Sequence, residues 1–279
     1  MSKIKFGVCE FCFPYWGEPA IRMAHEAGFE GMQISDGGGS DYSYPLNNEW
    51  IQDQYLEASS KYDIKLHALY LSTVAKHRGM CEAPDSVEGK LARENIKNGI
   101  LAAEKLGIHY LTFDYLRIYG EAAKNYMADA VRYAIEEGKD HGVQVEIEPD
   151  IPVSEQIKLI ESLDNQLKIC FDTYNPLMYG SGYPPKMIKM LGKDRIAYFH
   201  VKDSTRDAHG FVTKETTKSL PIGQGDTFFK ESAQAIKEID YEGWLMSETF
   251  YTRPNLHEGG LDYIELAHND LETLKKAFL

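Results

Sequence analysis

Four apolar segments in the second half of the chain each end in an acidic residue or a histidine. The segment QVEIEPD contains Glu148, LKICFDT contains Asp172, IAYFHVKD contains His200 and WLMSETF contains Glu248. Three carboxylates held in one place repel each other unless a cation neutralises them. Three oxygens and one nitrogen form a hard ligand set that suits Mn²⁺, Mg²⁺ or Co²⁺. The pattern predicts a divalent metal site, provided that the fold brings the four side chains together.

The four segments belong to a series of eight β-rich runs that alternate with helical stretches. The predicted strands are residues 4–9, 31–34, 65–71, 110–113, 144–148, 168–172, 196–201 and 243–249. Eight strand–helix pairs in about 250 residues match a (β/α)8 barrel. A doubly wound open sheet is the alternative, but no Gly-rich phosphate motif follows the first strand. Because no linker or composition shift interrupts the chain, residues 1–279 are predicted to form one (β/α)8 TIM barrel domain.

In such a barrel the reacting groups project from the carboxyl ends of the strands, which meet at one mouth. The last four predicted strands would each deliver a carboxylate or an imidazole to that mouth. A single acidic residue at a strand end is more often a helix cap or a partner in a surface ion pair. Four on consecutive strands favour the metal site over that alternative.

The composition limits where this protein works and what it binds. The chain has 279 residues, with 43% hydrophobic residues and a net charge of −13, which is typical of a globular protein with an acidic surface. Such a surface repels nucleic acids and anionic membranes. We find no signal-peptide pattern and no apolar run long enough to span a membrane. Four cysteines are too few for a disulfide scaffold, so we expect a reduced, cytoplasmic protein.

The motifs around these residues resemble the sugar-phosphate isomerase/epimerase superfamily. These xylose isomerase-like TIM barrels include ketose 3-epimerases, inosose isomerases and type IV endonucleases. The resemblance is carried by VEIEP, CFDTYN, FHVKD, PIGQGDTFF and YEGWLMSET, and more loosely by AGFEGMQIS and EKLGIHYLTF in the first half.

The resemblance implies a role for each of the four strand-end residues. The family's metal ligands fall on Glu148, Asp172, His200 and Glu248, and in the epimerases the two glutamates also form the acid–base pair. Arg206 falls where those enzymes place a substrate-contacting arginine. Asn175 stands where they have a histidine, and Gln33 where many members have a glutamate. These last two differences leave the ligand set intact and concern the contacts with substrate.

The function implied is that of a divalent-metal-dependent epimerase or isomerase acting on a keto sugar or sugar phosphate. The glutamates would move a proton next to the ketone through a metal-stabilised enediolate. Mn²⁺ is the first choice of cofactor, with Mg²⁺, Co²⁺ and Zn²⁺ as alternatives. A dehydratase or lyase acting on a keto sugar or inosose and a non-catalytic binding barrel remain open, as does the exact sugar. A DNA-repair endonuclease is disfavoured by Asn175 and by the acidic surface. Barrels of this kind commonly pair, so we expect a homo-oligomer.

Three further residues have both a substrate-binding and a structural interpretation. His67 in the third strand either points into the mouth as a hydrogen-bond partner or is a satisfied structural histidine. Lys202, with Arg206, precedes the Gly223–Gly225 turn and either contacts a substrate phosphate or merely flanks the turn. Glu155 either contacts a sugar hydroxyl or caps the helix that begins near Ser154. The cysteines, including Cys170, are interpreted as packing or incidental residues.

Overall fold

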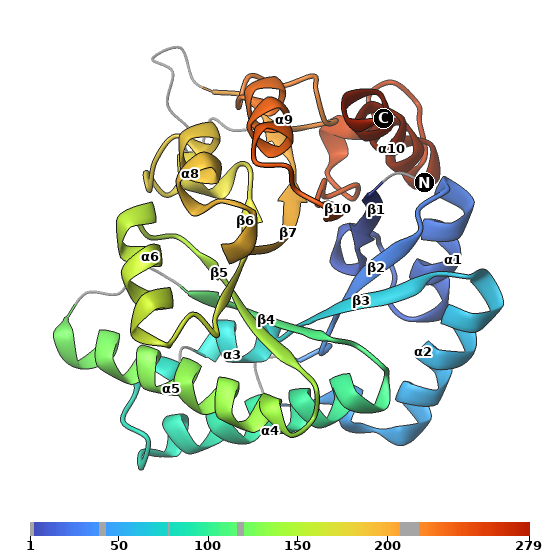
Figure 1. Ribbon diagram of the computed structural model, residues 1–279. Coiled ribbons are helices and arrows are strands. Elements are labelled where there is room, and N and C mark those ends of the chain that lie inside the picture. Colours follow the sequence, from blue (N-terminus) through green and yellow to red (C-terminus); the bar gives the residue numbers. More distant parts are fainter. Residues whose placement is uncertain (1–2, 39–42, 78, 116–119, 207–217) are drawn as a thin grey trace.

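Eight parallel strands form a closed barrel in the computed structural model, which describes residues 3–38, 43–77, 79–115, 120–206 and 218–279. Their order around the barrel is β1-β10-β7-β6-β5-β4-β3-β2, so β1 pairs with both β2 and β10 and closes the sheet (Figure 1). The strands are β1 (Ile4–Cys9), β2 (Gly31–Ser35), β3 (Lys65–Tyr70), β4 (Tyr110–Tyr115), β5 (Gln144–Pro149), β6 (Lys168–Asp172), β7 (Ile196–Val201) and β10 (Gly243–Ser247).

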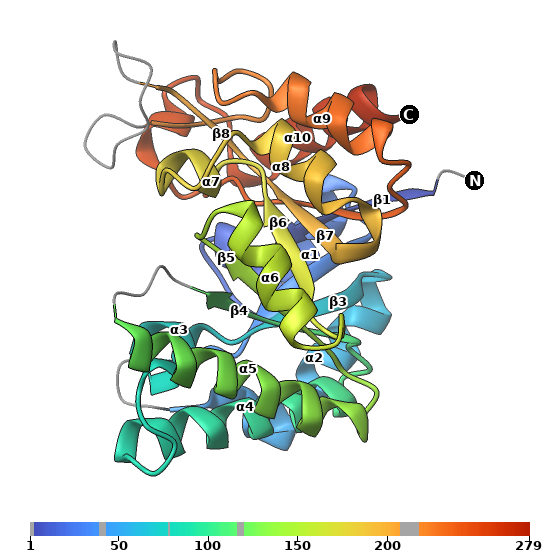
Figure 2. The ribbon, with the colours of Figure 1, turned by 60° about the vertical axis from the view of Figure 1, so that its left-hand side comes forward.

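The helices form a layer outside the barrel, as Figures 1 and 2 show. They are α1 (Glu18–Ala27), α2 (Glu49–Tyr62), α3 (Ser72–His77), α4 (Val87–Lys105), α5 (Glu121–Lys139), α6 (Val153–Ser162), α7 (Asn175–Met178), α8 (Pro184–Leu191), α9 (Phe229–Glu238) and α10 (Tyr263–Phe278). Short 3₁₀ helices lie at Glu10–Cys12, Pro45–Asn47, Gly79–Cys81, Lys193–Arg195 and Pro254–His257. The chain ends in α10, which packs against β1 and β10 where the barrel closes.

The prediction of a (β/α)8 barrel is confirmed, and all eight predicted strands are barrel strands. The largest differences are two residues. The fourth strand continues to Tyr115 instead of ending at residue 113, and the last strand ends at Ser247, so Glu248 and Thr249 already belong to the following loop. The sequence did not indicate the small antiparallel pair of β8 (Asp203–Ser204) and β9 (Ser219–Leu220), which lies outside the barrel. Strands of two residues carry too short a pattern to be predicted from periodicity.

The strands are buried on both faces, because their inward side chains fill the barrel and their outward side chains pack against the helices, which explains why their sequences are continuous apolar runs. Two glycines make room where the first two strands meet. Gly7 and Gly31 lie opposite each other in the register of β1 and β2. A Cβ added at Gly31 would lie 2.6 Å from the ring of Trp244 and 2.9 Å from the carbonyl oxygen of Lys65. The strand positions of these glycines therefore reflect close packing rather than turn formation.

We expect Gly31→Ala to lower the free energy of unfolding by about 1–3 kcal/mol, because the buried ring and carbonyl must move to admit the methyl group. Urea denaturation followed by circular dichroism measures this effect. Gly259→Ala is the matched control, because a Cβ there meets no atom within 4 Å. Equal stability of the two variants would contradict the packing argument.

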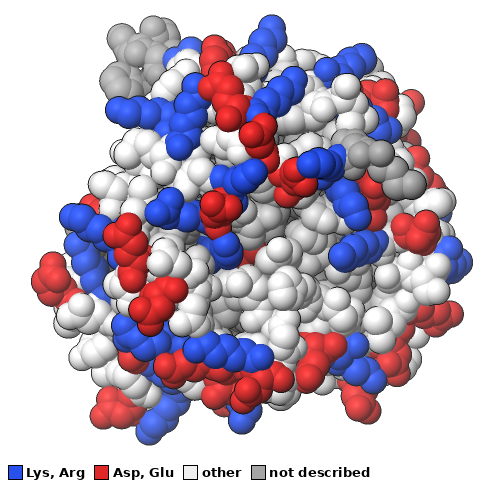
Figure 3. All heavy atoms as spheres, in the orientation of Figure 1, with Lys and Arg blue, Asp and Glu red and all other residues white. Residues whose placement is uncertain are grey.

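The outer surface carries mixed charge. On the face shown in Figure 3, acidic and basic side chains of the described residues are interspersed. Within the same part of the chain, every helix is too short or too polar to cross a membrane.

Candidate metal centre and active site

The four predicted ligand residues converge at the carboxyl ends of four neighbouring strands. Glu148 lies near the end of β5, Asp172 ends β6, His200 is near the end of β7, and Glu248 follows β10. One ligand atom from each lies within 4.8 Å of the corresponding atoms of the other three. Asp172 and His200 are also paired in the register of β6 and β7. The parallel barrel therefore places side chains from four distant segments at one level.

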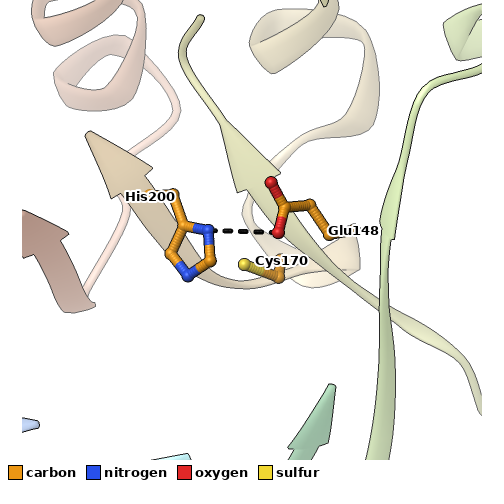
Figure 4. A group of neighbouring side chains, drawn as sticks. All are labelled: Glu148, Cys170 and His200. Carbon is orange, nitrogen blue, oxygen red and sulfur yellow. Dashed lines mark ion pairs between the residues drawn. The ribbon is translucent and has the colours of Figure 1, made fainter. Parts of the chain in front are cut away.

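The cluster is buried and its centre is the imidazole of His200. The Nδ1 atom of His200 lies 3.3 Å from Oε2 of Glu148 and 3.1 Å from Oε2 of Glu248. The side chains of His200, Glu148 and Glu248 are almost fully shielded from solvent. Figure 4 shows the carboxylate of Glu148 on β5 facing the imidazole of His200 on β7.

The hydrogen-bond partner of Nε2, the other imidazole nitrogen, fixes the orientation of the His200 ring. Nε2 of His200 lies 2.6 Å from Oε1 of Gln33, and the Gln33 amide nitrogen donates to the Tyr198 hydroxyl at 2.7 Å. Because the Gln33 oxygen faces the ring, Nε2 carries a hydrogen, and Nδ1 is the nitrogen whose lone pair is available to a metal ion. Nδ1 has no hydrogen-bond partner, although it is buried between two carboxylates. A lone pair facing two anionic oxygens is stabilised by a cation between them, so these residues fit a metal ion.

Gln33 thus acts on the ligand set through His200, and its loss has a measurable consequence. We expect Gln33→Leu to weaken Mn²⁺ binding by about 10–100-fold, because the imidazole is no longer held in the required tautomer. Isothermal titration calorimetry measures the affinity. Gln156→Leu is the matched control, because Gln156 is also buried but bonds to the carbonyl oxygen of Ile151. If both variants bind Mn²⁺ as the unaltered protein does, Gln33 does not set the tautomer.

The two carboxylate oxygens of Asp172 have different partners, the backbone for one and the cluster for the other. Oδ1 accepts from the backbone N–H groups of Tyr174 at 2.6 Å and Asn175 at 2.7 Å, where the short helix α7 begins. Oδ2 faces the cluster, where it lies 2.8 Å from Nζ of Lys202. The backbone contacts fix the carboxylate before any ligand binds, which is how a site is preorganised.

Lys202 lies within this cluster. Its Nζ is 2.8 Å from Oδ2 of Asp172 and 2.8 Å from Oε2 of Glu248. Burial alone would raise the pKa of Glu248, but Lys202 and His200 outweigh burial and hold this pKa well below its usual value. Glu248 is therefore a carboxylate at neutral pH. Lys202, which is predicted to contact substrate, forms ion pairs with two of the predicted metal ligands.

Asn175 contacts the remaining carboxylate. Its Nδ2 atom donates to Oε1 of Glu148 at 2.6 Å, which leaves Oε2 of Glu148 directed at His200. The residue predicted to contact substrate therefore also orients one of the two glutamates. Asn175 makes this contact from the first position of α7.

Sequence reasoning missed a fourth carboxyl group in the mouth. Asp114 on β4 is paired in register with Glu148, and burial together with the charge of Glu148 raises its pKa to about 7. The Tyr70 hydroxyl at the end of β3 forms a hydrogen bond with Asp114. The sequence pattern could have identified Asp114, because this residue follows the run YLTF just as the other acidic residues follow their apolar runs.

Cys170 also lies closer to the site than its interpretation as a packing residue implies. Its sulfur lies within ligand range of Glu148 and His200, one inward-facing position below Asp172 on β6 (Figure 4). Burial raises the pKa of Cys170 well above its ordinary value. Metals bind the thiolate, so the neutral thiol is a weaker candidate ligand than Asp172.

The other predicted substrate-binding residues lie outside the cluster. His67 stacks on Trp244 with a centroid distance of 4.8 Å, near the start of the strand that Glu248 follows. Burial lowers the pKa of His67 to about 3, so its ring is neutral. The guanidinium of Arg206 lies 4.5 Å from the ring of Phe228, beside a cavity of about 270 Å³. Glu155 is exposed in the first turn of α6, where a negative charge suits the helix dipole.

A closed parallel barrel with a strand-end cluster of three carboxylates and one imidazole defines the class of protein. Residues 21–276 match the family model for the xylose isomerase-like TIM barrel. The chain belongs to that family. The resemblance inferred from the motifs is thereby confirmed.

Solved structures with the same fold include sugar epimerases. D-allulose 3-epimerase from Methylomonas sp., in complex with D-allulose, superposes with a TM-score of 0.73 at 17% identity, covering 100% of this chain and 98% of that one. The IolI protein with a bound zinc atom gives a TM-score of 0.76 at 18% identity and 98% coverage of both chains. D-psicose 3-epimerase in the presence of D-fructose gives 0.77 at 15% identity, covering 98% and 99%. No curated protein sequence matches this chain.

Proposed function

We propose that this protein is a divalent-metal-dependent epimerase or isomerase that acts on a keto sugar or sugar phosphate. The observation that carries the proposal is the buried cluster of Glu148, Asp172, His200 and Glu248, in which Nδ1 of His200 lies 3.3 and 3.1 Å from oxygens of the two glutamates. Three buried carboxyl groups around one imidazole are stabilised by a cation between them. The fold shared with epimerases that bind D-allulose and D-fructose supports a ketose as the substrate class.

Glu148, Asp172, His200 and Glu248 would hold the metal. Three oxygens and one nitrogen suit Mn²⁺ best, while Mg²⁺, Co²⁺ and Zn²⁺ are alternatives, the last because the IolI structure contains zinc. A divalent ion at this position supplies Lewis acidity that stabilises negative charge on substrate oxygens.

We propose that the two glutamates transfer the proton. Glu148 on β5 and Glu248 after β10 are separated by β6 and β7 in the barrel, so they approach the space above His200 from two sides. Glu248, held ionised by Lys202 and His200, would remove the proton beside the ketone, and Glu148 would donate to the opposite face. Proton return to the opposite face of the same carbon inverts that centre, whereas return to the neighbouring carbon gives isomerisation.

Aromatic rings beside the cluster support a sugar as substrate. Phe11 follows β1 and lies 5.7 Å from the ring of Tyr70 and 6.0 Å from that of Phe250. All three residues come from the carboxyl ends of barrel strands. Rings of this kind pack against the C–H faces of sugars while the polar cluster binds the oxygens.

Incorporation of solvent deuterium tests this proposal. The protein is dialysed against a chelator, loaded with Mn²⁺ and incubated in D₂O with a panel of ketoses, inososes and ketose phosphates. We expect Mn²⁺-dependent exchange of one carbon-bound hydrogen in at least one compound, detected by mass spectrometry. Tight binding of Mn²⁺ without exchange across the panel would favour the non-catalytic barrel and contradict the proposal.

We also propose where the protein works and how it assembles. We place it in the cytoplasm, because Cys9, Cys12 and Cys170 are buried free thiols. We also propose a single domain over residues 1–279 that assembles as a homo-oligomer and does not bind nucleic acid. Size-exclusion chromatography with light scattering tests the oligomeric state.

A further inference from the structure

Lys202 is buried against two of the proposed metal ligands. Its side chain is 12% exposed, while Asp172 and Glu248 are 2% and 7% exposed. The ammonium lies 2.8 Å from one oxygen of each. A buried lysine in this position is an ion-pair partner for both carboxylates rather than a solvated surface group.

The ammonium contacts the oxygens that a metal would need. Oδ1 of Asp172 already accepts two backbone N–H groups, so Oδ2 is the oxygen that faces the cluster. Oε2 of Glu248 is the oxygen that lies 3.1 Å from Nδ1 of His200. Lys202 contacts both of these oxygens. An ammonium and a divalent ion that share them repel each other strongly, because two positive charges would lie at close range in a buried site.

The charge of the cluster explains why a cation must always be present. Glu148, Asp172 and Glu248 bring three carboxyl groups to a site where the buried imidazole of His200 can carry at most one positive charge. Buried carboxylates without a counter-charge are strongly destabilising. The ring of Tyr174 lies 5.9 Å from Nζ of Lys202 and adds a cation–π contact to the two ion pairs. The flexible four-carbon stem of lysine allows the ammonium to move away from the carboxylates.

We propose that Lys202 is an internal counter-ion that stabilises the metal-free cluster and is displaced from Asp172 and Glu248 when the divalent ion binds. This inference rests on the metal site of the proposed function. It gives Lys202 a role in the loading of the site. The free energy needed to break the two ion pairs lowers the affinity for every metal ion. It therefore disfavours ions that the cluster coordinates only weakly.

Comparison of Lys202→Met with Lys202→Arg tests the proposal. Methionine has a similar length without the charge, whereas arginine keeps the charge. We expect metal-free Lys202→Met to melt at a lower temperature than the unaltered protein and to bind Mn²⁺ about tenfold more tightly by calorimetry. Lys202→Arg is expected to bind Mn²⁺ no more tightly than the unaltered protein.

A second measurement uses the unaltered protein and so does not depend on how a variant folds. We expect Mn²⁺ to increase the rate at which an acetylating reagent modifies Lys202, measured by peptide mass spectrometry. Lys189, which pairs with Glu238 on the surface, is the internal control and should not respond. If Lys202→Met binds Mn²⁺ as the unaltered protein does and acetylation does not respond to Mn²⁺, the counter-ion role is wrong while the metal site stands. If the unaltered protein and Lys202→Met both fail to bind Mn²⁺, the metal site of the proposed function falls as well.

Discussion

Replacing Glu248 with glutamine is expected to reduce solvent-deuterium exchange by about 10²–10⁴-fold, the range of a lost general base. The amide cannot accept the proton, although its oxygen still faces the cluster. Glu148→Gln is expected to have an effect of similar size, because the proposed chemistry needs a group on each face of the substrate. Both effects are measured as initial exchange rates on the best compound of the panel, with saturating Mn²⁺.

The matched control for these two variants is Glu161→Gln. Glu161 is exposed in the last turn of α6, so its change should leave the exchange rate within a factor of about two. Circular dichroism and Mn²⁺ content confirm that each variant is folded and loaded. Exchange at the normal rate in a loaded Glu248→Gln or Glu148→Gln variant would remove that residue from the acid–base pair.

The second large effect is expected for Asp172→Asn. Asparagine keeps a side-chain oxygen for the backbone N–H groups of Tyr174 and Asn175, so the start of α7 is preserved. It replaces the charged oxygen that faces the cluster. We expect the affinity for Mn²⁺ to fall by at least about 100-fold, because a neutral amide is a much poorer ligand for a hard divalent ion than a carboxylate.

Elemental analysis after dialysis against a chelator gives the metal content of this variant, and calorimetry gives the affinity. Asp226→Asn is the control. Asp226 lies 3.6 Å from Nε of Arg206, in a loop outside the cluster, so its change should leave metal binding unaltered. Unchanged Mn²⁺ content in Asp172→Asn would show that Asp172 is not a ligand.

Each strand could be predicted from the residues of its own segment. Parallel strands that are buried on both faces read as short apolar runs, and the helices between them read as stripes of period 3.6. The segments 168–172 and 196–201 were predicted with their observed bounds. The end of the last strand was less well defined, because the segment WLMSETF contains no Gly, Pro, Asn or Asp to mark the strand end at Ser247.

The convergence of Glu148, Asp172, His200 and Glu248 could also be predicted, since a closed barrel places all its carboxyl strand ends at one mouth. The contacts of Lys202, Gln33 and Asn175 could not. Each joins residues that are far apart in the chain, for example Gln33 and His200, and depends on which rotamer the packed neighbours allow. The same holds for His67, whose strand position was known but whose stacking on Trp244 near the start of β10 was not.

The amino-acid sequence by itself determined the order of strands and helices and the residue types at the strand ends, because periodicity and composition are local properties. The tertiary structure alone decided which oxygens of Asp172 and Glu248 face Lys202 and which nitrogen of His200 carries the hydrogen. These features depend on distances of about 3 Å between side chains from different strands. Such distances are set by register and packing, which no single segment of the chain contains.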